Sequence, residues 1–221
     1  MLDRTTISHI APFGAYVFFM ILEDLLLKLG WEADDIRWLY AIKVIIVLSL
    51  LCLMRRAYSE LQWPSGTTFR TWLTAIVAGV VVFVAWINLT AEWMVMGESV
   101  SFDPRNDEQV DWFWVAVRLL GATLVVPIME ELFWRSFLMR WIDNVNFKSV
   151  NPAHVGFKAF LIVAALFALA HSLWLAGLFA GVVYGLLYIR YGTLWVPILA
   201  HAVTNGILGV WIVMTGNWGF W

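Results

Sequence analysis

The segment VVPIMEELFWRSF, residues 125–137, places Glu130, Glu131 and Arg135 inside an otherwise apolar stretch. A charged side chain at the centre of a membrane helix costs about 2.5–3.5 kcal/mol on insertion scales, so such groups mark functional sites by default. Glu131 and Arg135 are four residues apart, so a helix places them on one face, where they can form an ion pair. Glu130 points about 100° away from Glu131 and is therefore free to face a cavity.

Polar side chains interrupt two further apolar stretches. His171 ends the sequence FALAH, one helical turn after Phe167, which is expected to wall the same pocket. His201 and Asn205 lie in LAHAVTN, four residues apart, so a helix aims both at one point. Counted from the helix ends, Glu130, His171 and His201 fall about 12–20 Å from the same side of the membrane. They are therefore expected at a similar depth, between mid-membrane and the cytoplasmic face.

These residue types suit hydrolysis of an amide. Glu130 is the candidate general base toward a water molecule, and His171 is expected to help hold that water. His201 and Asn205 are candidates to donate hydrogen bonds to a developing oxyanion. No Ser, Cys or Thr nucleophile is tied to the set, so direct attack by water is expected rather than an acyl-enzyme.

A zinc site is the alternative for the same side chains. Glu130, His171 and His201 would then be the ligands, with one position open for water. The helical H-E-x-x-H arrangement is absent, the histidines come from separate helices, and Asn is a poor zinc ligand. The residues therefore favour a mechanism without a cofactor.

Composition identifies the elements that must position these groups. Of the 221 residues, 62% are apolar and 14% charged, and the mean hydropathy is +0.80. These values predict an all-α, polytopic membrane bundle forming a single domain over residues 1–221. The net charge of −2 gives no indication of nucleic-acid binding, and the single cysteine excludes an intramolecular disulfide.

The candidate spans are roughly 10–29, 36–54, 70–91, 112–140, 157–172, 174–190 and 194–214. Pro127 is expected to bend the fourth span just before the glutamates, by removing a backbone donor and freeing the carbonyl near Thr123.

The distribution of Lys and Arg predicts an orientation. We expect the chain in the inner (plasma) membrane of a cell, with its N-terminus in the cytoplasm. In this orientation eight basic residues lie on the cytoplasmic side and three on the outer side. The inner ones are Arg4, Arg55, Arg56, Arg70, Arg140, Lys148, Lys158 and Arg190, and the outer ones are Lys28, Arg37 and Arg105. Lys43 and Arg118, about two turns from the outer side, are expected to extend to the interface.

Three short motifs together resemble the CPBP family, which contains the CAAX prenyl endopeptidases and bacteriocin-processing relatives. EELFWR (130–135) is similar to the family's EExxxR motif, FALAH (167–171) to FxxxH, and HAVTN (201–205) to HxxxN. The resemblance covers a catalytic core of approximately residues 112–214. It implies a glutamate-type intramembrane protease in which Glu130 and His171 activate water, and His201 and Asn205 form the oxyanion hole. Glu131, Arg135 and Phe167 then become supporting residues.

Two features concern the branch of the family. Related endopeptidases have about eight spans, whereas this sequence shows seven candidates. The N-terminal half also resembles the branch found with bacterial exosortase systems, for which prenylated substrates are not expected.

The leading hypothesis is an endopeptidase that cleaves near the C-terminus of a peptide or a membrane-anchored protein in the lipid bilayer. A non-catalytic binding, immunity or assembly protein that keeps the polar pocket is the second hypothesis. A proton-coupled transporter is the third, and it would be expected to show an internal repeat, which the sequence lacks.

Overall fold

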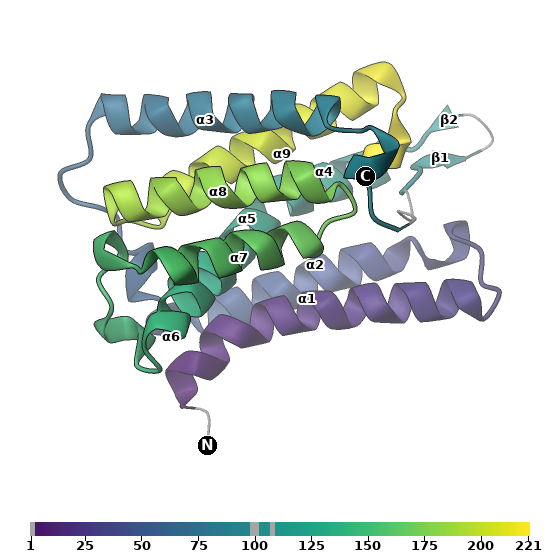
Figure 1. Cartoon of the computed structure of the whole chain (residues 1–221). Coiled ribbons are helices and arrows are strands. Elements are labelled where there is room, and N and C mark those ends of the chain that lie inside the picture. Colours follow the sequence, from purple (N-terminus) through teal and green to yellow (C-terminus); the bar gives the residue numbers. More distant parts are fainter. Residues whose placement is uncertain (1–2, 98–101, 107–108) are drawn as a thin grey trace.

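The computed structural model describes residues 3–97, 102–106 and 109–221 as a bundle of roughly parallel and antiparallel helices (Figure 1). A single two-residue hairpin is the only sheet within these ranges. The helices and strands in chain order are α1 (Arg4–Lys28), α2 (Trp38–Leu53), α3 (Phe69–Asn88), β1 (Arg105–Asn106), β2 (Gln109–Val110), α4 (Trp112–Leu120), α5 (Val126–Glu131), α6 (Met139–Asp143), α7 (Phe157–Leu169), α8 (Trp174–Tyr191) and α9 (Trp195–Thr215). The predicted all-α bundle is confirmed.

Six helical stretches in the described part of the chain are long and apolar enough to cross a membrane. They are Arg4–Lys28, Asp34–Leu53, Phe69–Asn88, Trp112–Asp143, Trp174–Tyr191 and Trp195–Thr215. The remaining apolar helix, α7, has 13 residues and is shorter than the predicted span at 157–172. The chain is therefore a multi-pass membrane protein with seven helices at the predicted places, one of them short.

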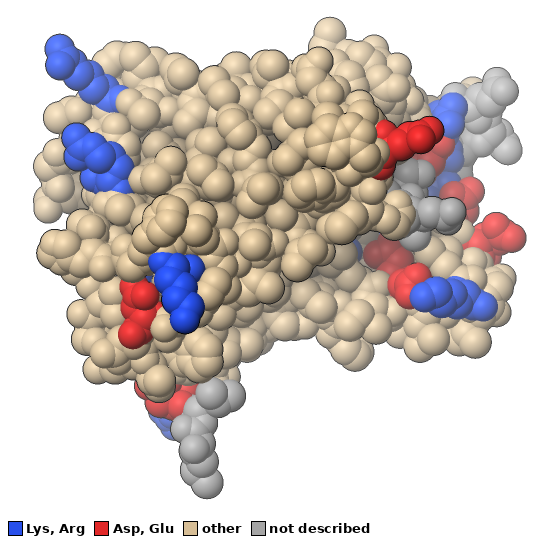
Figure 2. Space-filling view, in the orientation of Figure 1, with Lys and Arg blue, Asp and Glu red and all other residues tan. Residues whose placement is uncertain are grey.

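The two ends of the bundle differ in charge. Residues 54–68, 144–156 and 192–194 connect helices at one end, here called the basic end because it carries most of the Lys and Arg residues. Residues 29–37, 89–97, 102–106, 109–111 and 170–173 and the C-terminus lie at the opposite, acidic end (Figure 1). On the face shown in Figure 2, charged side chains gather near these ends, and a broad band without them lies between. Large exposed apolar side chains such as Ile21, Ile45, Val77 and Leu186 are available to contact lipid.

Helices α3 and α9 approach closely through a glycine. A Cβ added at Gly79 would overlap the carbonyl oxygen of Ala200 and the side chain of Val203. Thr204 Oγ1 donates a hydrogen bond across the same contact to the Gly79 carbonyl, at 2.8 Å. Small residues drive helix association in lipid, where burial of apolar surface gives little. This contact therefore fixes α9, which carries His201 and Asn205.

The long fourth span changes its winding twice. Two π-helical stretches, residues 121–125 and 132–138, separate α4 from α5 and α5 from α6. In the first, the Val126 N–H bonds to the Gly121 carbonyl five residues back, directly before Pro127. π-Helical turns are rare and occur mostly near functional sites. The first π-helical turn ends just before Pro127, where a bend is predicted, and the second follows the glutamates.

A carboxylate at the basic end holds this long helix to its surroundings. Glu60, whose side chain is 10% exposed, accepts hydrogen bonds from Ser136 Oγ at 3.0 Å and from Lys148 Nζ at 3.3 Å. Arg140 Nη1 lies 3.5 Å from Glu60 and donates to Tyr188 of α8 at 3.1 Å. Burial by itself would raise the pKa of Glu60, but the His9 imidazole 3.7 Å away and the Lys148 ammonium outweigh it and hold this pKa below its ordinary value of 4.5.

Alanine at Gly79 is expected to destabilise the bundle, because its Cβ would push α3 away from α9. Overpacking of this kind costs about 1–3 kcal/mol. Thermal unfolding in detergent measures the effect. Gly14→Ala is the matched control, since Gly14 is also helical but has no atom within 4 Å of the added Cβ. Equal melting temperatures for the two variants would contradict the close approach.

Glu60→Gln is expected to lower stability by about 1.5–3 kcal/mol near neutral pH, because it removes hydrogen bonds to charged groups. The lowered pKa makes this contribution present above about 4.5 and lost as pH falls below that value toward the folded-state pKa. The difference in melting temperature between wild type and variant should therefore narrow as the pH is lowered below 4.5. A difference that stays constant over that range would show that Glu60 is not held ionised.

Candidate active site

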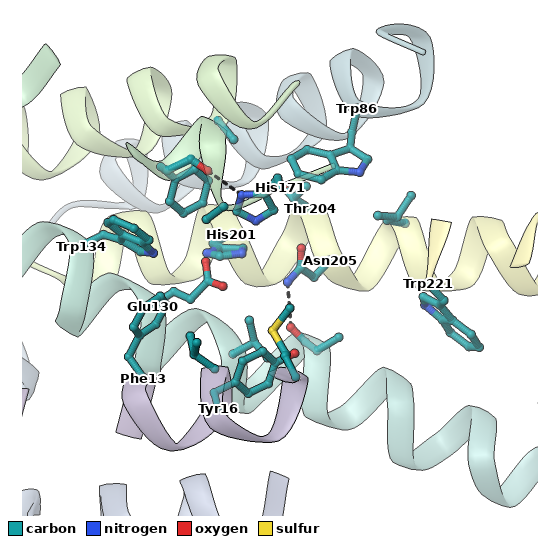
Figure 3. A pocket seen from close by; sticks show the side chains of 18 of the residues that line it. Phe13, Tyr16, Trp86, Glu130, Trp134, His171, His201, Thr204, Asn205 and Trp221 are labelled. Carbon is teal, nitrogen blue, oxygen red and sulfur yellow. Dashed lines mark hydrogen bonds between the residues drawn. The ribbon is translucent and has the colours of Figure 1, made fainter. Parts of the chain in front are cut away.

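Side chains from the predicted motifs line one cavity of about 550 Å³. Glu130 from α5, His171 from the turn after α7, and His201 and Asn205 from α9 all border it, together with Phe167 (Figure 3). Glu131 and Arg135 lie behind the wall of this cavity, with side-chain exposures of 0% and 1%. The structure thus brings the four predicted catalytic residues together and places the two charged supporting residues next to them.

Glu131 connects the long helix to α9. Its Oε1 accepts a hydrogen bond from Arg135 Nη1 at 3.1 Å, the predicted ion pair, and another from His201 Nδ1 at 3.0 Å. The Arg135 guanidinium also lies 4.3 Å above the Phe167 ring. Because the carboxylate accepts, His201 Nδ1 carries a hydrogen, and Nε2 is the ring nitrogen left for a ligand. Glu131 therefore sets both the orientation and the tautomer of His201.

Two residues that the sequence interpretation missed complete the surroundings of His201. The Tyr184 ring is stacked on the imidazole, with centroids 5.0 Å apart and planes 19° apart. The Tyr184 hydroxyl donates to Thr204 Oγ1 at 2.7 Å. Thr204 lies inside the HAVTN motif, and Tyr184 lies between small residues of α8, but neither position carries a sequence signal of its own. Tyr184 therefore restricts the imidazole by stacking, and Thr204 holds the Tyr184 hydroxyl in place.

His171 is positioned by the end of α7. The Nδ1 atom lies 2.7 Å from the Phe167 carbonyl oxygen, which can only accept, so Nδ1 carries the hydrogen. In the neutral ring Nε2 then has a free lone pair. The ring lies 5.4 Å from Trp86, edge to face, and 4.5 Å from Phe167. His171 therefore presents a hydrogen-bond acceptor to the cavity, from an apolar setting that restricts its rotation.

Glu130 is a cavity residue with an unsatisfied polar atom. It is 8% exposed, and its Oε2 is buried without a hydrogen-bond partner among the described residues. Its carboxylate turns toward the space bordered by His201 and Asn205 (Figure 3). A buried acceptor without a partner costs about 1–3 kcal/mol, more for a charged group. Such an atom is suited to bind a water molecule or a substrate hydrogen.

Asn205 is held by the irregular winding of the long helix. In the i to i−5 register of residues 121–125, the N–H that would reach the Ala122 carbonyl belongs to residue 127, and Pro127 has none. Asn205 Nδ2 donates to that carbonyl instead, at 2.8 Å (Figure 3). The freed carbonyl is thus that of Ala122, next to the expected Thr123. One amide hydrogen is used in this way, and the other remains for a ligand.

The alternative zinc ligands do not form a metal-binding group. Within residues 3–97, 102–106 and 109–221, no three His, Cys, Asp or Glu side chains are arranged to hold a metal ion. Glu130, His171 and His201 border the same cavity, from α5, the turn after α7, and α9. Dependence on a metal is left to the chelation assay described below.

The cavity extends toward the acidic end of the bundle. Its further lining includes Met20 and Asp24 of α1, Arg118 of α4, and Trp221. The sequence interpretation did not predict this direction. It was also wrong for Lys43, which is 3% exposed and lies 3.5 Å from Glu23 instead of extending to the interface.

Residues 112–207 match the family model described as type II CAAX prenyl endopeptidase Rce1-like. No curated protein and no solved structure matches the chain. The matched segment contains Glu130, Glu131, Arg135, His171, His201 and Asn205 in the order and at the intervals of the three motifs. The exosortase-associated branch stays a prediction. The segment that forms the cavity of this multi-pass membrane chain is therefore similar to the CAAX-type membrane endopeptidases.

Proposed function

We propose that this protein is an intramembrane endopeptidase that hydrolyses a peptide bond near the C-terminus of a membrane-associated peptide or protein, using water activated by Glu130. One observation carries the proposal. An unpaired carboxylate oxygen of Glu130 borders the same cavity as His171, His201 and Asn205, in the segment that matches a protease family. Hydrolysis needs a base, a water position and an anion site in one place, and this cavity brings together the side chains for all three.

The first step is attack by water. Glu130 accepts a proton from a water molecule whose other hydrogen bonds to His171 Nε2, while the water oxygen adds to the carbonyl carbon of the substrate. Glu130 then gives the proton to the leaving nitrogen, and the carbon–nitrogen bond breaks. A positioned general base contributes about 10²–10⁴-fold in rate.

The oxyanion of the tetrahedral intermediate needs donors. The free hydrogen of Asn205 Nδ2 supplies one. His201 supplies a second from Nε2 when its ring is doubly protonated, since Nδ1–H is committed to Glu131. Each donor of this kind is worth about 10²–10³ in rate. Glu131, Arg135 and Phe167 act as positioning residues in this scheme, because they contact His201 and His171 rather than the substrate.

The orientation proposed from Lys and Arg places the basic end in the cytoplasm of a cell with an inner (plasma) membrane. In that orientation the cavity is reached from the opposite side, because it extends from Glu130 toward the acidic end. Access from that side leaves the expected depth of the reacting groups, between mid-membrane and the cytoplasmic face, as a prediction.

Glu130→Gln is expected to reduce cleavage about 10²–10⁴-fold, because the amide cannot take the proton of water. The assay uses purified protein in lipid vesicles, a mixed library of apolar peptides, and mass spectrometry of the products. Folding should be unaffected, since the replaced oxygen has no protein partner to lose. Glu92→Gln is the matched control, because Glu92 is an exposed acid outside the cavity.

Two alternatives are separated by the same measurements. A non-catalytic binding or immunity protein would cleave nothing and would keep its biological activity in the Glu130→Gln variant. Cleavage that is lost on chelation and restored by zinc would replace the metal-independent scheme with one in which Glu130, His171 and His201 hold the ion.

Glu131→Gln is expected to lose both activity and stability, in contrast to Glu130→Gln. Removing one partner of a buried ion pair costs about 3–5 kcal/mol, since Arg135 is left with uncompensated charge. The His201 tautomer is also no longer fixed. Thermal unfolding alongside the cleavage assay distinguishes the two glutamates. If Glu131→Gln melted like the wild type, the role of Glu131 as the connection between the helices would be refuted.

A further inference from the structure

The cavity continues into a second lobe. An adjoining space of about 690 Å³ shares nine lining residues with the first: Tyr16, Met20, Asp24, Trp86, Arg118, Ala170, His171, Phe220 and Trp221. Its other lining comes from the acidic end of the bundle, including Glu23, Lys43 and Phe102. The two spaces are parts of one cleft that leads from Glu130 past Arg118 to the acidic end.

Arg118 stands at the junction of the two lobes without a carboxylate partner. Its Nε is buried and makes no hydrogen bond within the described part of the chain. Its guanidinium carbon instead lies 4.4 Å above the Tyr40 ring and 5.3 Å above the Phe102 ring. Aromatic faces offset the charge only in part, by about 0.5–2 kcal/mol. The guanidinium therefore has donors that remain available to an anion.

The other cations near this lobe are already paired. Lys43 Nζ lies 3.5 Å from a carboxylate oxygen of Glu23, and Lys28 Nζ lies 2.6 Å from Asp24. Arg118 is thus the cation with uncompensated charge among the described residues that line the cleft. An arginine in such a setting recognises a carboxylate by two parallel hydrogen bonds.

We propose that Arg118 binds the C-terminal carboxylate of the peptide substrate and thereby selects which bond reaches Glu130. This inference rests on the proposed endopeptidase function. Arg118 and Glu130 face one continuous cleft. A single peptide bound in this cleft can therefore place its carboxylate at Arg118 and the bond to be cleaved at Glu130. A lipid phosphate is the competing anion, but a headgroup held at Arg118 would block the cleft rather than deliver a bond.

The separation along the helix sets a register for the substrate. The two residues are twelve positions apart, which corresponds to about 18 Å at 1.5 Å per residue and somewhat less in the π-helical turns. An extended peptide spans about 3.3–3.6 Å per residue. The bond that is cleaved should therefore lie about four or five residues before the free C-terminus.

The test compares a cleaved peptide with its C-terminal amide, using the full-length protein in lipid vesicles. The wild type should cleave the free acid with a kcat/KM about ten- to a hundredfold higher than that for the amide. This factor corresponds to the contribution of a hydrogen bond to a charged group. Arg118→Gln should bring the ratio of the two kcat/KM values close to one, and Arg118→Lys should restore part of it. Lys28→Gln is the matched control, since it removes a cation of the acidic end that is already paired, and it should leave the ratio unchanged. Residues added at the C-terminus should move the cleaved bond by the same number of positions.

Three results would overturn the inference. Equal cleavage of acid and amide by the wild type, or a ratio that Arg118→Gln leaves unchanged, would refute it while leaving the endopeptidase function intact. A ratio that is unaffected by Arg118→Gln, together with a changed dependence on phosphatidylglycerol in the vesicles, would assign Arg118 to a lipid phosphate instead. Failure to cleave any peptide would remove the endopeptidase function, and the inference with it.

Discussion

The site depends on one buried carboxylate. Glu131 is fully inaccessible and lies between an arginine of its own helix and a histidine of α9. The apolar interior penalises each of these groups separately, so the three are stable there only together. Because each hydrogen bond requires the others, the long helix and α9 can occupy only one relative position. The adjacent acid, Glu130, needs no protein partner for that purpose and is free for the substrate.

The backbone contributes to the same geometry. In lipid, a carbonyl without its helical donor must find another partner. Pro127 creates that situation at Ala122, and Asn205 resolves it. The proline therefore acts through the backbone rather than through its own side chain. It supplies the acceptor that orients an amide from a helix far away in sequence.

The sequence predicted the places of the helices, and it singled out side chains that the structure brings to one cavity, because both follow from local patterns. Continuous apolar runs identify membrane helices, and charges inside them stand out against that background. The Glu131–Arg135 pair follows from helical spacing alone. The contact of Glu131 with His201 does not, since it joins positions 70 residues apart.

Other features depended on three-dimensional packing. Tyr184 and Thr204 are ordinary residues of apolar helices until α8 and α9 meet around His201. Lys43 was expected to extend outward, but Glu23 of the neighbouring helix provides a partner inside the bundle. The direction of the cleft was also hidden, because helix depth can be counted from a sequence whereas open space between helices cannot.

The shortness of α7 has a consequence for the surrounding lipid. Its 13 residues span about 20 Å, whereas the hydrocarbon layer is about 30 Å thick. The turn that carries His171 therefore lies short of the far surface of the hydrocarbon layer. Hydrophobic mismatch of this kind thins the bilayer locally, so that headgroups and water lie closer to the turn. The proposed hydrolysis needs water beside the scissile bond, and a locally thinner bilayer would bring it there. The length of the lipid acyl chains would then change how readily water reaches the His171 imidazole. The rate of the proposed reaction would therefore depend on membrane thickness.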